Sequence, residues 1–486
     1  MLWLALHFRH LPLEVFTRGV RPDVQPIVIA SGAETDATVV AANRPAQTRG
    51  VSAGMSVSAA CALASGLHTI ARNAAKEHAT LARIAAWALQ FTSFVSIDES
   101  GDASAVLLEI EGSLKFFGGL GKLYQHIARG IAELGFDASI ACAPTPLAAQ
   151  WFARAGVSVR VQHHDALRHA LEQLPADLLC DSEATRIQLE NFGARTLGDC
   201  LRLPRDGLAR RAGPHLPDQL DRALGMRPDP RLPFVAPQTW SATLPLPAPV
   251  AQADALLFAA RRLLAELCGW LTATGHGVQR PRFEFIHEKK LVTIITLELA
   301  NATRDLNHLT NLLRERLART ELPCATMEIA IASGRVTPLA SRNLAFFPDS
   351  AGQAESSSRF VERLSARLGA NTICGLTPHA DYRPERAWRA CRPGTATNET
   401  TSLMPTRPLW LLSTPRPLRE TNAAPHEHDG DPLSLLAGPE RIEAGWWDGQ
   451  HVARDYFVAR NAAQSLLWIY RERNVPVRWY VHGFFS

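Results

Sequence analysis

The sequence predicts an α+β protein of several domains, and three observations lead to that prediction. The chain has 486 residues, which is more than a single hydrophobic core usually serves. Short β-branched runs alternate with apolar residues at helical spacing through about the first 340 residues, a pattern typical of sheets covered by helices. Residues 432–486 differ in composition, because they hold four of the eleven Trp and three of the five Tyr.

The first region, residues 1–165, is expected to be a helix-covered sheet with a smaller segment inserted at about 16–79. Residues 2–8 and 105–110 are apolar runs of strand length, and residues 120–134 repeat apolar side chains at helical spacing.

The rest of the chain divides by composition. A basic region with glycines that end helices and Thr residues that cap them is predicted to be helical. Strand and helix patterns alternate in the region after it. The C-terminal segments alternate apolar and polar residues, which predicts a small antiparallel β-meander. Three strands barely form a core alone, so the aromatic residues either fill a small sheet or dock on another surface. The predicted segments are a helical region at 166–236, an α/β domain at 237–342, a flexible linker or partner region at 348–431 and an aromatic-rich module at 432–486, whose strands cover 452–460, 465–473 and 477–485.

Charge and cysteine usage narrow the function classes. The net charge is +4, and almost every cation is Arg, which suits phosphate contact but also follows from a GC-rich genome. The eight Cys form no CxxC pair, which argues against a zinc site and a disulfide scaffold and suits a reducing cytosol. Neither a signal peptide nor an uncharged apolar run of about 18 residues is evident, so a cytoplasmic protein without a membrane partner is expected.

Two adjacent carboxylates, Asp98 and Glu99, follow an apolar run at a predicted strand end. Such a pair holds divalent metal when a third carboxylate comes from elsewhere in the fold, as two-metal phosphoryl transfer requires. The alternative role is structural, in turn formation and capping near the strand end.

Three motifs in a fixed order resemble the Y-family translesion DNA polymerases over about residues 1–340. They are Ser96-Ile-Asp-Glu99, Gly50-Val-Ser-Ala-Gly-Met55 and Phe192-Gly-Ala-Arg-Thr-Leu-Gly-Asp199. The resemblance implies a palm at 1–165 carrying the fingers, a helical thumb at 166–236 and a little finger at 237–342. The stretches 438–449 and 479–485 are similar to one branch in particular, the polymerase-like subunits of bacterial mutasomes.

The sequence departs from this family where the chemistry takes place. In active members the first strand supplies the third metal-binding Asp, and here Ala5 stands at that position, with His7 at the second acid. A methyl group cannot bind Mg²⁺, a hard ion that takes oxygen ligands. Where the family places a Tyr and an Arg toward the triphosphate, this chain has Arg44 and Gln47, and Pro146 replaces the palm Lys. We therefore expect Asp98 and Glu99 to be remnants of a metal site, no catalytic residue and no cofactor.

The family often holds a DNA phosphate with a glycine-rich thumb hairpin, but here Cys180-Asp181-Ser182 replaces that turn, and Asp181 repels phosphate. DNA contact is therefore expected from cationic side chains elsewhere. Contacts from such cations are salt-sensitive and independent of sequence, and the alternative at each position is a solvated basic face. The candidates are Arg205, Arg210, Arg211 and Arg222 in the thumb and Lys289 and Lys290 in the little finger.

A short apolar motif follows the little finger in a polar, proline-bounded segment. It comprises Asn343, Leu344, Ala345, Phe346 and Phe347, and it resembles the pentapeptide by which bacterial proteins bind the sliding clamp. Leu344 and the Phe pair would be the apolar anchors, and Asn343 would supply amide hydrogen bonds. The alternative is a terminal strand of the little finger. A rival stretch at 432–436 lacks the amide and the terminal aromatic.

The leading hypothesis is a non-catalytic, polymerase-shaped adaptor in DNA damage-induced mutagenesis and translesion synthesis. The resemblance implies as partners the sliding clamp, primer–template DNA, a RecA-like protein and an error-prone replicative-type polymerase, at the nucleoid in the cytoplasm. One alternative is an active, divergent polymerase that uses Mg²⁺ with Asp98, Glu99 and an acid such as Asp102. Another is a DNA-binding protein without clamp contact.

Overall fold

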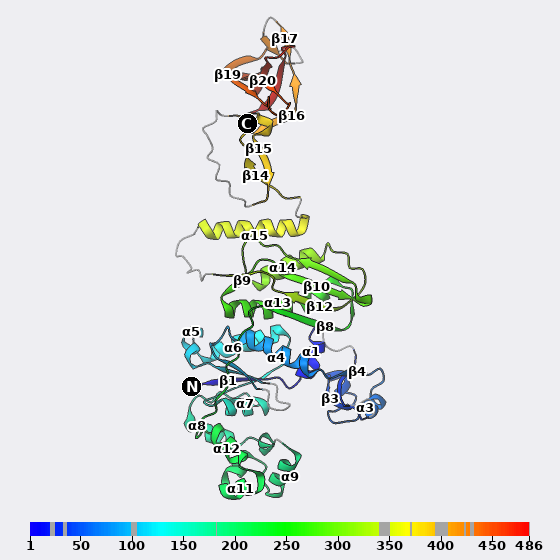
Figure 1. Ribbon diagram of the computed structural model, residues 1–486, viewed down its shortest axis with the longest axis vertical. Helices are drawn as coiled ribbons and strands as arrows, with labels where there is room; N and C mark the ends of the chain where they lie inside the picture. The colour runs from blue at the N-terminus through cyan, green and yellow to red at the C-terminus, as the bar shows by residue number, and fades with distance from the viewer. Residues whose placement is uncertain are drawn as a thin grey trace. The chain divides into compact units, whose positions relative to one another are not determined.

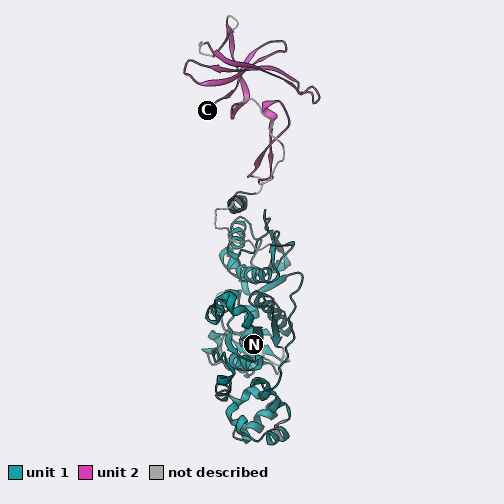
Figure 2. Cartoon of the chain, turned by 90° about the vertical axis from the view of Figure 1, so that its left-hand side faces the viewer, with its two compact units in different colours: residues 1–367 teal, residues 368–486 magenta. Residues whose placement is uncertain are grey.

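The computed structural model describes residues 1–19, 25–32, 36–98, 105–180, 182–339, 350–369, 372–393, 407–421, 424–427 and 432–485, with the backbone alone at 211–212 and 350–356. The chain forms two compact units, residues 1–367 and 368–486 (Figure 2). Among the described residues, no helix is long and apolar enough to cross a membrane.

An antiparallel four-stranded sheet in the order β5-β6-β1-β7 forms the centre of the palm (Figure 1). All five residues of the central strand β1 are buried, as expected for a run flanked by strands on both sides. The strands are β1 (Trp3–His7), β5 (Val95–Asp98), β6 (Ala105–Glu109) and β7 (Ser139–Ala143).

Helices cover both faces of this sheet. Leu4 and Leu6 of β1 pack with α4 (Ala74–Ala88) and α6 (Leu120–Leu134) in one core. Trp3 and Ala5 point to the opposite face, where α7 (Pro146–Arg154) and the thumb share a second core with them. The period-2 alternation of the strand thus divides the palm into two apolar layers.

The fingers form a small body of their own. Their sheet has the order β3-β2-β4 and a core of small residues. Asn43 caps the short helix α2, and its side chain also accepts from the backbone N–H of Ile27 at 2.9 Å. The elements are α1 (Leu11–Thr17), which leads in from the palm, β2 (Ile27–Ser31), β3 (Thr38–Ala42), α2 (Arg44–Gln47), α3 (Val57–Leu63) and β4 (His68–Ala71).

The thumb is helical, as predicted. Thr196 begins a helix with a reciprocal capping box to Asp199, and Gly193 adopts the left-handed conformation that ends the preceding helix. The helices are α8 (His164–Glu172), α9 (Glu183–Asn191), α10 (Leu197–Arg202), α11 (Arg205–Ala212) and α12 (His215–Ala223).

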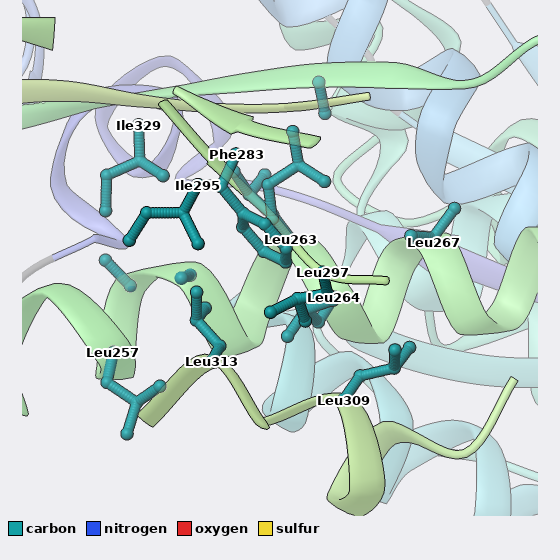
Figure 3. Packing of buried hydrophobic residues seen from close by; sticks show 14 of the residues in the cluster. Leu257, Leu263, Leu264, Leu267, Phe283, Ile295, Leu297, Leu309, Leu313 and Ile329 are labelled. Atoms are coloured by element: carbon teal, nitrogen blue, oxygen red, sulfur yellow. The ribbon is translucent and has the colours of Figure 1, made fainter. Parts of the chain in front are cut away.

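The little finger pairs a four-stranded sheet with two helices over an apolar core that Figure 3 shows from close by. Phe283 and Ile329 of the sheet meet Leu263 and Leu313 of the helices in this core. The sheet order is β11-β10-β12-β8. Its elements are β8 (Ser241–Val250), α13 (Ala253–Thr274), β10 (Arg282–His287), β11 (Val292–Thr296), α14 (Leu306–Leu317) and β12 (Thr326–Ala332).

The little finger and the palm join through α13, which packs against α4 and α6. Trp87 of α4 lies against two glycines, since a Cβ at Gly130 or Gly269 would come within 2.3 or 2.1 Å of its ring. Glu266 of α13 is buried and accepts from two palm guanidinium groups, Arg18 and Arg83. Packing and charge pairing together make this interface part of one compact unit.

The second unit contains a five-stranded antiparallel sheet in the order β16-β22-β21-β20-β19. The predicted meander corresponds to its last three strands. On one face Tyr456, Trp468 and His482 stack, with centroids 4.1 Å apart for the Tyr–Trp pair. The strands are β16 (Trp410–Pro417), β19 (Ser434–Ala444), β20 (Val452–Arg460), β21 (Leu466–Glu472) and β22 (Trp479–Phe484).

The range 348–431 is predicted as a flexible linker or partner region, and its described part carries one helix and several strands. Strand β16 was not predicted, because it contains two prolines, which are tolerated on an edge strand but conceal it in the sequence. Arg383 adds a tertiary anchor, because its guanidinium bonds Asp381 and Asp448. The elements are α15 (Ser350–Leu368), β14 (Gly375–Pro378), β15 (Trp388–Cys391), β16, β17 (Arg419–Thr421) and β18 (Ala424–His426).

Candidate functional site

The α7-facing surface of the palm sheet carries the positions that matter for metal chemistry. Strand register places Asp98, Ala105 and His7 in one cross-strand row. The neighbouring row on the same face runs through Leu107 and Ala5. Ala5 therefore shares a face with Asp98 but is fully buried, and its methyl group belongs to an apolar core.

The Asp98 carboxylate is buried and engaged by protein donors. Its Oδ2 accepts a hydrogen bond from the Gln150 side-chain amide of α7, and Arg231 Nη1 lies 3.8 Å from its Oδ1. Glu99 and Asp102 lie outside the described residues.

Arg231 completes a small polar network around that carboxylate. Its Nη2 lies 2.8 Å from Asp229 Oδ2 and 3.5 Å from Gln150 Oε1. The Gln150 amide therefore donates to one member of the network and accepts from another. The charge next to the Asp98 carboxylate is a guanidinium supplied by the chain itself.

Among the described residues, the arrangement around Asp98 does not fit Mg²⁺. The ion prefers six oxygen ligands in near-octahedral geometry. Ala5 supplies no oxygen, and both Asp98 oxygens already face N–H donors. In the parts of the chain that the structure describes, no three His, Cys, Asp or Glu side chains gather as a metal site requires.

The positions expected at the triphosphate serve local structure. Gln47 Nε2 donates to the Ala42 carbonyl at 2.8 Å, and Arg44 is exposed in the first turn of α2. Pro146 is buried in the first turn of α7, where a missing N–H costs nothing. Thr145 caps that helix and donates to Ala223 of the thumb at 2.7 Å.

A cavity of about 790 Å³ lies where α1, the fingers and the little finger meet. Glu14 and Arg18 of α1 and Arg262 of α13 line it. Burial raises the pKa of Glu14 to about 7 and lowers that of Arg262 to about 10. Sequence reasoning missed these residues, because charged positions four apart on a short helix resemble an ordinary surface pair.

The chain is similar to known proteins over most of its length. The model of the impB/mucB/samB family matches residues 18–154. Two curated proteins named ImuB, from two strains of Caulobacter vibrioides, are each 27% identical over 470 residues, covering 90% of this chain and all of the relative. The chain is an ImuB-like protein. With the mixed α/β palm and the antiparallel C-terminal sheet, this similarity confirms the predicted fold class.

Solved polymerase structures also align with the ImuB-like chain. A Dbh ternary complex covers 68% of it, with 16% identity and a TM-score of 0.39. The crystal structure of DinB from Sulfolobus solfataricus covers 70%, with 17% identity and a TM-score of 0.38. Each solved chain is covered almost entirely, at 98% and 100%.

The thumb arginines of the ImuB-like chain are partly neutralised by neighbouring acids. Arg205 pairs with Asp221, and Arg222 Nε lies 2.8 Å from Asp218 Oδ2. Arg210 is exposed on α11. The side chain of Arg211 lies outside the described residues, as does Asp181.

Lys289 and Lys290 lie at the tip of the β10–β11 hairpin of the little finger. Both are exposed and have positive φ, at 63° and 60°. They belong to the little finger and the arginines to the thumb, so the structure presents the candidate DNA contacts on two separate elements rather than in one cluster.

The clamp-like motif at 343–347 lies outside the described residues, but both of its flanks are anchored to the little finger. On one side Leu339 N–H donates to the Gly275 carbonyl at 2.9 Å. On the other, Glu362 of α15 lies 2.6 Å from His308 Nε2 and accepts from Ala300 N–H, also at 2.6 Å. The rival stretch is different, because Leu433 is buried in the core of the C-terminal sheet.

Proposed function

We propose that this ImuB-like chain is a non-catalytic adaptor with the shape of a polymerase. It acts in DNA damage-induced mutagenesis and translesion synthesis, where it links the sliding clamp and primer–template DNA to an error-prone replicative-type polymerase. ImuA, a RecA-like protein, is its further partner. The observation that carries the proposal is the Asp98 carboxylate, which Gln150 and Arg231 engage on a face where Ala5 supplies no ligand.

The chemical argument concerns charge neutralisation. Nucleotide addition needs cations that bridge the reacting phosphate and carboxylates on two strands. Here one strand contributes a methyl group, and the carboxylate on the other already faces a guanidinium. Pro146 and Gln47 also offer no positive charge where a triphosphate would need it.

A primer-extension assay on the full chain tests the absence of catalysis. With Mg²⁺ and all four nucleotides, we expect no extension above a mock purification, and none after Asp98→Ala. Extension that depends on Mg²⁺ and disappears in the variant would establish instead the active, divergent polymerase.

The clamp contact is supported by the motif's position between two anchored flanks. Leu339 and Glu362 are both held on the little finger, and the ten residues 340–349 separate Leu339 from the start of α15. At about 3.5 Å per residue, residues 340–349 span at most about 35 Å. A short tether loses less conformational entropy on binding than a long free tail.

Clamp binding is measured by surface plasmon resonance with immobilised sliding clamp. Replacing Leu344, Phe346 and Phe347 by Ala is expected to weaken binding at least tenfold, because anchor side chains dominate such interfaces. The matched control replaces Leu435 and Leu436, exposed residues of the rival stretch, and should bind as wild type does. Unchanged affinity in the triple variant would favour the DNA-binding protein without clamp contact.

The DNA contact is proposed to be weak and electrostatic. Lys289, Lys290 and Arg210 are exposed, whereas Arg205 and Arg222 are paired with acids. We therefore expect Lys289→Ala with Lys290→Ala to lower both the affinity for primer–template and the salt slope of binding, measured by fluorescence anisotropy, more than Arg205→Ala does. Equal effects would contradict this ranking.

A further inference from the structure

The segment that joins the thumb to the little finger, residues 228–237, is here called the connector. It lies along β5, the edge strand of the palm sheet. The Phe234 N–H donates to the Val95 carbonyl at 2.7 Å, and the Phe234 ring packs against both the palm core and the little-finger core. The connector thus satisfies one backbone carbonyl on the edge strand β5, which would otherwise lack a strand partner on that side.

A second attachment lies three residues earlier, at Arg231. Its side chain and those of Asp98 and Asp229 are 14%, 8% and 7% exposed. Gln150 lies between Asp98 and Arg231 and hydrogen-bonds both. Four polar side chains from β5, α7 and the connector therefore contact one another in a largely buried site, as buried charges require.

We propose that Arg231 has taken the electrostatic place of a metal ion at the palm, and that Asp98 is a positioning residue that holds the connector on β5. Buried carboxylates need a compensating positive charge, and the chain supplies it with one guanidinium, which hydrogen-bonds Asp229 and lies 3.8 Å from Asp98. Unlike a metal ion, Arg231 cannot exchange with solvent, so the site is closed and the connector is fixed. This inference rests on the non-catalytic part of the proposed function, and it does not depend on clamp or DNA contacts.

The proposal explains why an acid persists opposite Ala5. Removing the carboxylate would leave Arg231 beside Asp229 alone and would free Gln150 Nε2 in a buried site. It also links two attachments of the little finger to the palm, the connector at β5 and Glu266 at α13. The palm acid thereby serves domain geometry instead of chemistry.

The first test is a Mn²⁺ titration of the full chain, followed by the loss of the free-ion electron paramagnetic resonance signal. We expect no stoichiometric site in wild type, Arg231→Ala or Asp98→Asn. One Mn²⁺ per chain in wild type that is lost in Asp98→Asn would overturn the proposal.

The second test reads the connector directly, by hydrogen exchange of peptides that span residues 228–240 in the folded chain. Asp98→Asn and Arg231→Gln are each expected to speed exchange in this peptide at least tenfold, and the double variant should be no faster than the faster single variant. Glu298→Gln, which breaks an exposed pair with Arg280, is the control and should leave exchange unchanged.

Unchanged exchange in both single variants would overturn the inference while leaving the proposed function intact. Mg²⁺-dependent primer extension, in contrast, would contradict the proposed absence of catalysis. The two failures are therefore distinguishable. Arg231→Gln leaves both Asp98 and Asp229 without a cation, whereas Arg231 still pairs with Asp229 in Asp98→Asn, so Asp98→Asn keeps the test decisive if Arg231→Gln does not fold.

Discussion

Replacing Glu266 by Gln tests the interface between the palm and the little finger. Glu266 and Arg18 are each 1% exposed, and Arg83 is 17% exposed. Gln keeps an acceptor oxygen but removes the negative charge. Burial already lowers the pKa of Arg18, and the Glu266 carboxylate offsets part of that effect. The variant therefore leaves a buried guanidinium without its anion.

The loss in free energy of unfolding depends on which hydrogen bonds the Glu266→Gln variant keeps. Breaking a buried ion pair by removing one partner costs about 3–5 kcal/mol. Arg18 retains its 3.1 Å bond to the Leu134 carbonyl, and Arg83 reaches solvent, so the lower part of that range applies. We expect a loss of about 3–4 kcal/mol, which is roughly a 10²- to 10³-fold change in the unfolding equilibrium constant.

Urea unfolding of the full chain measures this loss, with far-ultraviolet circular dichroism and tryptophan emission recorded together to check whether their transitions coincide. The control is Glu298→Gln, whose pair with Arg280 is more than half exposed and should contribute less than about 1 kcal/mol. A loss in Glu266→Gln no larger than in this control would refute the reasoning.

Three further predictions concern packing and pH. Gly130→Ala should destabilise the chain in urea by at least about 1–3 kcal/mol, because its Cβ would lie 2.3 Å from the Trp87 ring, whereas Gly121→Ala on the same helix meets nothing within 4 Å and should be neutral or slightly stabilising. The raised pKa of Glu14, about 7, means that folding takes up a proton, so stability in urea melts should fall by up to about 3 kcal/mol from pH 4.5 to pH 7 and Glu14→Gln should flatten that slope. The pKa of His482 is lowered to about 4, so its effect on stability runs in the opposite direction. The free energy of unfolding of the C-terminal sheet, followed by the near-ultraviolet circular dichroism of the aromatic stack, should fall by up to about 3 kcal/mol as pH falls from 6.5 to 4. Equal stability at both pH values would contradict the buried neutral imidazole.

Local patterns predicted the palm well. The helix expected at 120–134 matches α6 at both ends, because the apolar spacing is regular and Gly135 takes the left-handed cap conformation with φ of 83°. The strand expected at 2–8 contains β1, whose backbone period of two places Ala5 on one face and Leu4 on the other. The resemblance to the polymerase family added that Ala5 stands where active members carry a metal-binding Asp.

The partners of Asp98 could not be predicted in this way. Arg231 is 133 positions away in the sequence, within a proline-rich segment that carries no periodic signal. The acid that Arg231 contacts depends on how the connector packs along β5. That packing is tertiary structure, which local sequence propensity does not determine. Strands β16 and β19 were missed for a related reason, because register shifts interrupt their pairing and break the alternation that reveals a strand.

The contact of Trp87 with two glycines has a consequence for how this interface can change over generations. A larger residue at Gly130 or Gly269 is excluded while the indole is present, and a smaller residue at 87 would leave a void between three helices. The three positions can therefore change only together, so that a larger side chain at one is matched by a smaller side chain at another. Among relatives that keep this helix contact, a bulky side chain at 130 or 269 should accompany a small one at 87.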